Sequence, residues 1–208
     1  MPDELGDAQA AATPIAFATA WHMLFTMGGL RAGETVLINS VASGIGSAAL
    51  QLATLTGAFT IGTASSREKL DRAEALGLER AIDYTRESVP DAVMEATGGA
   101  GADLVFEHVG GDSFQRGLDA LSRNGRMVVA GGHAGEVVPF DIIPFFRGQK
   151  RVLGSSAFTS DEVRTVLALA AHGRVTPLVH AALPLAEARA ATELLEGRGH
   201  FGKVVLLP

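Results

Sequence analysis

The sequence predicts an α/β protein built on a doubly wound parallel sheet, and three observations support this fold class. From residue 34 onward, short apolar runs alternate with longer segments of helical periodicity, which requires crossover connections and places helices on both faces of a parallel sheet. A turn of small residues, 40–46, follows the first apolar run, at the carboxyl end of a strand, where such sheets bind ligands. Glycine accounts for 25 of the 208 residues, above its usual share of about 7%, which favours repeated close approaches of the backbone.

Each strand is predicted from a short apolar run between turn residues. The first, residues 35–39, follows the turn at 31–34 and is apolar almost throughout, as expected for a strand that is buried on both faces. The other predicted strands of the sheet are residues 59–63, 81–83, 104–109, 126–130 and 151–154. Six strands in two halves match the dinucleotide-binding variant of the doubly wound fold, the Rossmann-type sheet.

Helical periodicity fills the segments between these runs. Residues 47–55 place Ala48, Leu52 and Leu55 on one face, which gives this helix an apolar side to pack on the sheet. The other helices predicted between or beside the strands are residues 68–76, 91–96, 113–121 and 142–146.

Two segments flank the predicted sheet. Residues 8–27 form one helical pattern that Pro14 interrupts, whereas the end of the chain predicts helices over 161–172 and 185–196 and a last strand over 203–207. We therefore divide the chain into an N-terminal helical segment (1–29), a sheet domain (30–158) and a C-terminal segment of helices and one strand (159–208).

Composition excludes several classes of function. The net charge of −6 argues against a nucleic-acid-binding or anionic-membrane-binding surface. The absence of cysteine excludes disulfides, thiolate zinc sites and cysteine nucleophiles. No apolar run reaches the roughly 20 residues that span a bilayer, and residues 1–7 lack the pattern of a signal peptide. We expect a cytoplasmic protein without nucleic-acid or membrane partners.

The turn at residues 40–46 is the first candidate site. It ends a strand and opens a helix, where free backbone N–H groups bind a pyrophosphate. Against the pattern G-x-G-x-x-G only the last glycine is present, as Gly46, while Val41 and Ser43 stand at the earlier glycine positions and Gly44 adds a second flexible point. The alternative is a plain Gly-Ser turn that joins a strand to a helix.

The end of the second predicted strand is the second candidate site. NAD-binding domains often carry Asp or Glu there to bind the ribose 2′-hydroxyl. Here the chain has Ser65 and Ser66, followed by Arg67 and Lys69, which suit a 2′-phosphate. The sequence thus favours NADP(H) over NAD(H). Alternatively, Ser65 or Ser66 caps the helix and the two cations are solvated.

These residues belong to a set of motifs by which the chain resembles the medium-chain dehydrogenase/reductase superfamily. It is most similar to the quinone oxidoreductase and zinc-type alcohol dehydrogenase-like members. The matching segments, in the family order, are TAWH (19–22), LRAGETVL (30–37), SGIGSAALQLA (43–53), ALG (75–77), IDY (82–84), GRMV (125–128) and HFGKVVL (200–206).

The resemblance implies a role for each candidate cofactor-binding residue. The pyrophosphate would be held by Ser43, Gly44, Ile45 and Gly46, and the 2′-phosphate by Ser65, Ser66, Arg67 and Lys69. Tyr84 would lie beside the adenosine phosphate, and Val109 and Gly110 would flank the adenosine. The nicotinamide would be approached by Gly131, Gly132, His133, Ser155, Ser156, Ala157 and Phe158, and Thr19 would lie near both the phosphates and the nicotinamide. For Tyr84 the alternative is a surface tyrosine at a strand end. For His133 it is an ordinary loop histidine.

The resemblance implies hydride transfer between NADPH and a quinone, enone or other carbonyl or alcohol substrate, without zinc. A zinc site is not expected because there is no cysteine and the six histidines are scattered, with none at an i, i+4 spacing. The short-chain dehydrogenase class needs Lys four residues after its Tyr, but Ser88 holds that position after Tyr84. Glu107 and His108 are neighbours on a strand, so they face opposite sides and form no dyad. No catalytic residue is assigned, and His133 is the best candidate for a polar pocket contact.

Two departures from the family pattern bear on activity. Ser40, Val41 and Ala42 replace the earlier glycines of the phosphate turn. The family's N-terminal GroES-like catalytic domain is expected to be missing, so we expect this chain alone to be inactive. The alternative is a stand-alone dinucleotide-binding module without catalysis of its own.

The resemblance also implies a homodimer through the sixth strand. The candidate edge carries Gln149, Arg151 and Leu153, and an unpaired strand edge favours association with a second copy.

Overall fold

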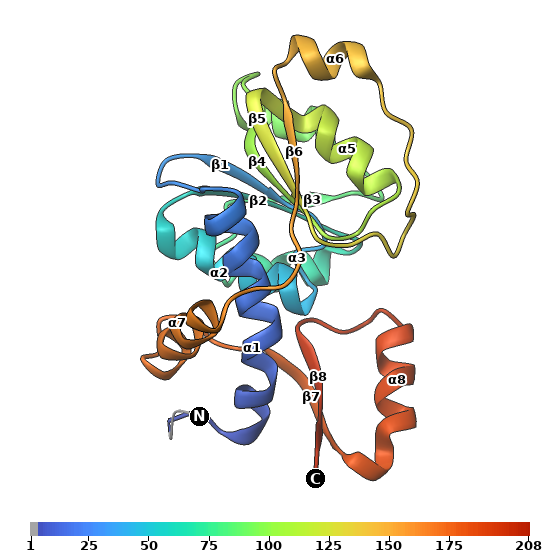
Figure 1. Cartoon of the computed structure of the whole chain (residues 1–208). Coiled ribbons are helices and arrows are strands. Elements are labelled where there is room, and N and C mark those ends of the chain that lie inside the picture. Colours follow the sequence, from blue (N-terminus) through green and yellow to red (C-terminus); the bar gives the residue numbers. More distant parts are fainter. Residues whose placement is uncertain (1–3) are drawn as a thin grey trace.

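The computed structural model describes residues 4–208 and confirms the predicted fold class (Figure 1). Six parallel strands form one sheet in the order β3-β2-β1-β4-β5-β6, the order of a dinucleotide-binding sheet. The strands are β1 (Thr35–Ile38), β2 (Phe59–Ala64), β3 (Arg80–Asp83), β4 (Ala102–Glu107), β5 (Leu121–Val129) and β6 (Arg151–Gly154).

Helices cover both faces of this sheet because the strands are apolar on both sides. In β1, Val36 and Ile38 pack into one core, whereas Leu37 packs into the other. The first core is formed with α1 (Asp7–Trp21), α2 (Gly44–Thr56), α3 (Arg67–Glu74) and α7 (Ser160–Ala171), and the second with α4 (Val89–Ala96) and α5 (Asp112–Ala120). The short α6 (Ile142–Arg147) lies at the far end of the sheet from the C-terminus (Figure 1).

The N-terminal helix continues through Pro14 and ends in a wider π-helical segment, His22–Met27. This segment ends where Gly28 approaches the sheet so closely that a Cβ there would lie 2.5 Å from Leu104 Cδ1. The predicted single helix over 8–27 is therefore correct in position, but its last turns change geometry against β4.

The C-terminal segment contains a strand that the sequence pattern did not predict. Strand β7 (Val179–Pro184) pairs in parallel with β8 (Lys203–Leu207), and the connection contains a 3-10 turn (Leu185–Glu187) and α8 (Ala188–Glu196). This β7–α8–β8 unit stands beside the carboxyl end of the main sheet (Figure 1). Gly202 N–H joins it to the phosphate turn by donating to Ala42 O at 2.9 Å.

No helix within residues 4–208 combines the length and the apolar character needed to cross a bilayer.

Candidate nucleotide site

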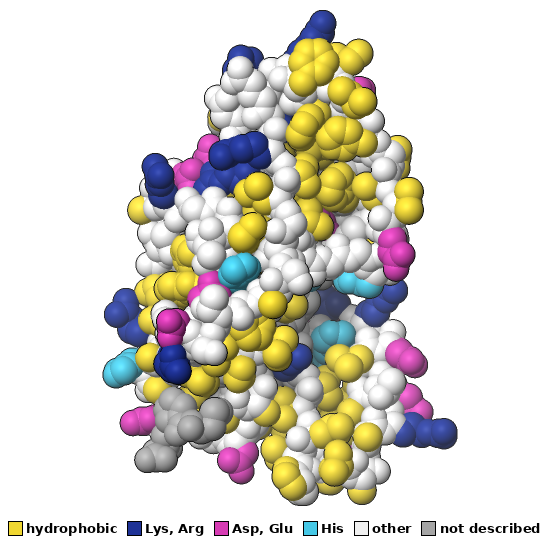
Figure 2. Space-filling model, viewed as in Figure 1, with side chains coloured by type: hydrophobic (Ala, Val, Ile, Leu, Met, Phe, Trp, Pro, Cys, Tyr) yellow, Lys and Arg dark blue, Asp and Glu magenta, His cyan; other side chains and the backbone are white. Residues whose placement is uncertain are grey.

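A cavity of about 810 Å³ opens at the carboxyl edge of the main sheet. Its walls come from the loops after β1, β2, β3, β4 and β5, and the segment before β8 closes one side. Figure 2 shows Lys, Arg and His side chains around the hollow between the main sheet and the β7–α8–β8 unit. This is the edge at which parallel α/β sheets bind ligands.

The phosphate turn is a tightly folded helix start. Ser43 caps α2, since its hydroxyl accepts the Gly46 N–H at 2.9 Å. Ser40 adopts a φ of 53°, a left-handed conformation that glycine would take more easily. Gly46 has no room for a side chain, because a Cβ would lie 2.2 Å from Ser40 O. Of the two glycines in the turn, Gly46 is the one that the packing requires.

The start of α2 presents a free donor to a ligand. The N–H group of Ile45 has no acceptor within residues 4–208, as expected for the first turn of a helix, whereas the parallel bridge between Ser43 and Gly202 directs the Gly44 N–H toward Gly202 O. Both residues line a smaller hollow of about 220 Å³ that shares Ser43 and His108 with the main cavity. An anionic group fits there because the N-terminus of a helix carries partial positive charge.

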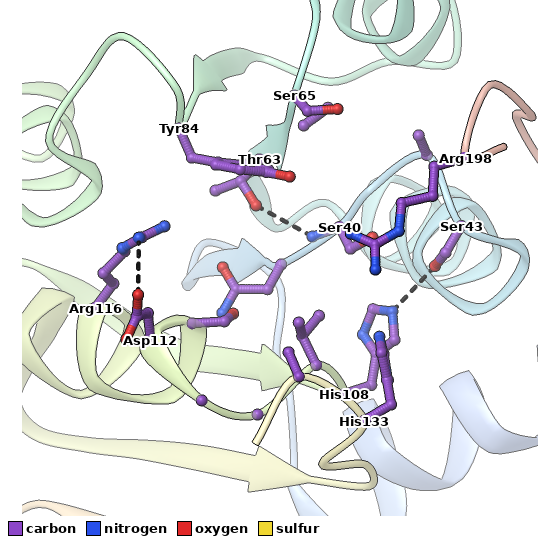
Figure 3. Close-up of a pocket in the computed structure, with 18 of the residues that line it drawn as sticks. Ser40, Ser43, Thr63, Ser65, Tyr84, His108, Asp112, Arg116, His133 and Arg198 are labelled. Carbon is purple, nitrogen blue, oxygen red and sulfur yellow. Dashed lines mark hydrogen bonds and ion pairs between the residues drawn. The ribbon is translucent and has the colours of Figure 1, made fainter. Parts of the chain in front are cut away.

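His108 lies directly below this turn (Figure 3). Its Nε2 is 3.0 Å from Ser43 Oγ, and only 7% of the residue is exposed. Burial, reinforced by the nearby His133, lowers the pKa of His108 to about 4. The imidazole is therefore neutral at physiological pH.

Glu107 organises the loop after β4 from the opposite side of the strand. Its carboxylate accepts hydrogen bonds from the N–H groups of Val109 and Gly110 at 2.6 and 2.8 Å, from Ser113 Oγ at 2.8 Å and from Asn39 Nδ2 at 2.5 Å. Glu107 is fully buried, and these four donors compensate for its desolvation. Glu107 and His108 have separate partners, as their adjacent positions on a strand imply.

A cationic rim borders the cavity where α3 meets the segment before β8. Ser65, Lys69 and Arg198 line the cavity, and Lys69 Nζ donates to Arg198 O. The Arg198 side chain extends toward Ser40 and Ser43 (Figure 3). Arg67 instead pairs with two carboxylates of α3 and lies outside the cavity lining.

Tyr84 and Arg116 form the wall on the far side from the phosphate turn. The guanidinium of Arg116 lies 5.9 Å from the centre of the Tyr84 ring, and its Nη2 lies 3.6 Å from Asp112 Oδ2. Tyr84 is 41% exposed. This aromatic face at the mouth of the cavity is available for stacking.

The loop after β5 packs on the loop after β4 backbone to backbone. Ala134 N–H donates to Val109 O at 2.9 Å, and Gly111 N–H donates to Gly135 O at 3.1 Å. A Cβ on Gly110 would lie 2.7 Å from Gly132 Cα. Glycine is therefore required where these two loops meet, and this contact between the loops positions His133 at the cavity.

The structure brings together some of the predicted site residues and leaves others outside. Ser43, Ser65, Lys69, Tyr84, Val109, Gly110 and His133 line the main cavity, and Gly44 and Ile45 line the adjoining hollow. Thr19, Gly46, Ser66, Arg67, Gly131, Gly132, Ser155, Ser156, Ala157 and Phe158 line neither. Among these, Gly46 shapes the turn, and Ser66 caps α3 by accepting the Lys69 N–H at 3.5 Å. The assigned roles remain predictions.

Several lining residues were not predicted from the sequence. The polar and charged ones include Asn39, His108, Asp112, Arg116, Arg198 and His200. Arg198 and His200 stand about 130 positions after Lys69, and only the docking of the β7–α8–β8 unit brings them to the site. The run Gly-Arg-Gly-His at 197–200, directly before a predicted strand, was the available signal.

Within residues 4–208, no three His, Cys, Asp or Glu side chains lie close enough together to hold a metal ion. The donor set of this segment therefore does not fit a zinc site.

Comparison with known proteins identifies the family. The model of the zinc-binding dehydrogenase family matches residues 44–172. A quinone oxidoreductase of Pseudomonas aeruginosa is 33% identical over 217 residues and covers 100% of this chain, which spans 67% of that protein. Of three further curated relatives, the chain spans 6%, 40% and 10% of the full length.

Solved structures agree with this assignment. An NAD-dependent alcohol dehydrogenase superposes with a TM-score of 0.92 at 38% identity, covering 100% of this chain and 60% of its own. A mycobacterial protein complexed with NADPH superposes with a TM-score of 0.92 at 29% identity, covering 100% of this chain and 67% of its own. The chain thus belongs to the zinc-binding dehydrogenases of the medium-chain dehydrogenase/reductase superfamily and corresponds to their cofactor-binding portion.

Proposed function

We propose that this chain is the NADP(H)-binding domain of an oxidoreductase that transfers hydride between NADPH and a quinone, enone or other carbonyl or alcohol substrate. The observation that carries the proposal is the cavity at the carboxyl edge with its adjoining hollow, which together are lined by the start of α2 and by the cationic rim of Lys69 and Arg198. Two separate anion-binding regions suit a nucleotide with a pyrophosphate and a further phosphate. The bound cofactor supplies the hydride, and the protein supplies its position.

The cationic rim favours a 2′-phosphate. Ser65, Lys69 and Arg198 face the cavity, and β2 ends without a carboxylate that would repel the phosphate. The two structural relatives differ in their nucleotide, since one is an NAD-dependent alcohol dehydrogenase and the other was solved in complex with NADPH. The preference for NADP(H) thus depends on the residues of this chain.

Calorimetric titration with NADPH and NADH tests this preference. We expect NADPH to bind at least about 10-fold more tightly, because an ion pair with a phosphate contributes on the order of 1–3 kcal/mol. Lys69→Ala should weaken NADPH by about 10-fold and leave NADH unchanged. Arg67→Ala is the matched control, two residues away and already paired with Asp71 and Glu74. Equal affinity of the unmodified chain for both nucleotides would contradict the preference, and binding of neither would contradict the proposed function.

The activity of the whole enzyme needs its own test. A panel of quinones and enones, with NADPH oxidation followed at 340 nm, should show turnover by the full-length gene product and almost none by this chain. Substantial turnover by these 208 residues would show that the substrate pocket lies within them. Binding without turnover by the full-length product would favour a dinucleotide-binding module.

We also propose a homodimer through β6. This strand ends the sheet order, and its Arg151 and Val152 are exposed. Exposed apolar side chains continue the surface onto the neighbouring α6, namely Ile142, Ile143 and Phe146, and Figure 2 shows this apolar patch at the top of the molecule. An open edge beside an apolar patch favours pairing with a second copy. Light scattering should give a dimer mass, and Val152→Lys should give a monomer; a monomeric unmodified chain at high concentration would contradict the proposal.

A further inference from the structure

The contact between Ser43 and His108 has a property that a simple helix cap does not explain. His108 is 7% exposed and borders both hollows of the site, yet its Nδ1 has no hydrogen-bond partner within residues 4–208. Buried polar atoms without partners are uncommon in folded proteins. A buried histidine with one free nitrogen beside a phosphate turn points to a role in binding.

The protons of the pair are limited in number. Neutral His108 carries one ring proton and Ser43 carries one hydroxyl proton, and Ser43 Oγ already accepts the Gly46 N–H at 2.9 Å. The 3.0 Å contact between Ser43 Oγ and His108 Nε2 uses one of the two protons. The other proton stays free, on either the hydroxyl or Nδ1.

The surroundings decide between these two arrangements. If the hydroxyl donates to Nε2, the ring proton lies on Nδ1 as a buried donor without an acceptor. If Nε2–H donates to Ser43, Nδ1 is a bare acceptor and the hydroxyl proton is free. An unpaired buried N–H is costlier and rarer than an unpaired acceptor. The second arrangement is therefore favoured.

We propose that His108 is a positioning residue whose Nε2–H holds the Ser43 hydroxyl so that its proton faces the pocket and donates to a phosphate oxygen of the nucleotide. This inference rests on the proposed function. Capping α2 occupies the Gly46 N–H, a donor that would otherwise be available to the phosphate. The Ser43 hydroxyl proton replaces it, in a turn that lacks the earlier glycines of the usual pattern.

A double-mutant cycle on nucleotide affinity tests the coupling. His108→Leu should weaken NADPH by about 3- to 5-fold, as for the partial loss of a hydrogen bond to a charged group. It should leave binding of 2′-AMP unchanged, because that ligand has no pyrophosphate. In a Ser43→Ala background the same substitution should have no further effect. His108→Gln, whose amide can donate from a similar position, should bind within about twofold of the unmodified chain.

The outcomes separate this inference from the proposed function. An unmodified chain that does not bind NADPH overturns both. An unmodified chain that binds NADPH, with additive losses from Ser43→Ala and His108→Leu or no loss from His108→Leu, overturns only the role of His108. If His108→Leu does not fold, imidazole 15N spectra of the unmodified chain still decide. A proton on Nε2 supports the proposal, and a proton on Nδ1 overturns it.

Discussion

The two ends of the parallel sheet differ in their buried polar groups, because each end holds a paired charge but the carboxyl end also holds groups without partners. At the amino ends of β1, β4 and β5, the Arg126 guanidinium donates to the carbonyls of Gly28, Gly29 and Asp103 and to both carboxylate oxygens of Glu34. Each of its donor groups is used. At the carboxyl ends Glu107 is likewise paired, but the Ile45 N–H at the start of α2 and Nδ1 of His108 lack partners within residues 4–208.

This difference separates stability from function in one sheet. A buried charge with all its hydrogen bonds made holds elements together. Removing one partner leaves the other groups buried without hydrogen bonds, so their desolvation is no longer compensated. Groups left without partners cost stability and retain the capacity to bind a ligand. The amino end fixes the π-helical segment to the strands, and the carboxyl end remains ready for an anion.

The largest expected effect comes from removing the amino-end cation. Arg126→Met should lower the free energy of unfolding by about 3 kcal/mol or more, because Glu34 and three carbonyls lose their partner. Arg123→Met is the matched control on the same strand, since Arg123 is exposed and makes one long contact with Arg147 O at 3.3 Å. Urea denaturation measures both. An equal loss of unfolding free energy in the two variants would contradict the stabilising role of the Arg126 hydrogen bonds.

The carboxyl end should be sensitive to acid through His108. Its pKa is lowered from 6.5 to about 4 in the folded chain by burial and the proximity of His133, so the unfolded chain binds more protons between these values. Stability should therefore fall as the pH decreases from about 6.5 to 4, by up to about 3 kcal/mol. His108→Gln should remove this part of the slope, as measured by urea denaturation at several pH values. An identical pH dependence in both chains would contradict the assignment.

Substituting the two glycines of the phosphate turn should have different effects on stability. Gly46→Ala places a Cβ 2.2 Å from the Ser40 carbonyl oxygen and should destabilise by about 1–3 kcal/mol. Gly44→Ala meets the flexible Lys203 side chain, with Cδ at 2.5 Å, and lies 3.8 Å from Gly202 O, an ordinary contact; it should change stability by less than about 0.5 kcal/mol. Thermal unfolding measures the pair. A larger loss at Gly44 would show that the turn has another geometry.

The smallest effects are expected from two adjacent serines at the cationic rim. Ser65 lines the cavity, whereas Ser66 caps α3. Ser65→Ala should weaken NADPH by about threefold with unchanged stability, as expected for one lost hydrogen bond. Ser66→Ala should leave the affinity unchanged and lower stability by about 0.5–1 kcal/mol. Calorimetry and thermal unfolding separate the two, and exchanged phenotypes would contradict the placement of these side chains.

Local sequence patterns were sufficient for the main sheet. Apolar runs such as 35–39 produce strands buried on both faces, and Ser43 and Ser66 begin helices because their hydroxyls cap free N–H groups. Strand β7 was not predicted because Ala181, Ala182 and Leu183 favour a helix as readily as a strand, and Pro184 ends the run. Its pairing with β8 therefore decides its conformation.

The sequence by itself determined the fold class, the phosphate turn and the absence of a carboxylate at the end of β2, since each depends on neighbours in the chain. Only the tertiary structure decided which polar side chains share the cavity. Lys69 meets Arg198 across 129 positions, and Ser43 meets His108 across 65. Arg67 is directed to Asp71 and Glu74 by helical spacing, one turn and two turns further along α3. Contacts between distant segments follow from how the elements pack, and local periodicity carries no information about them.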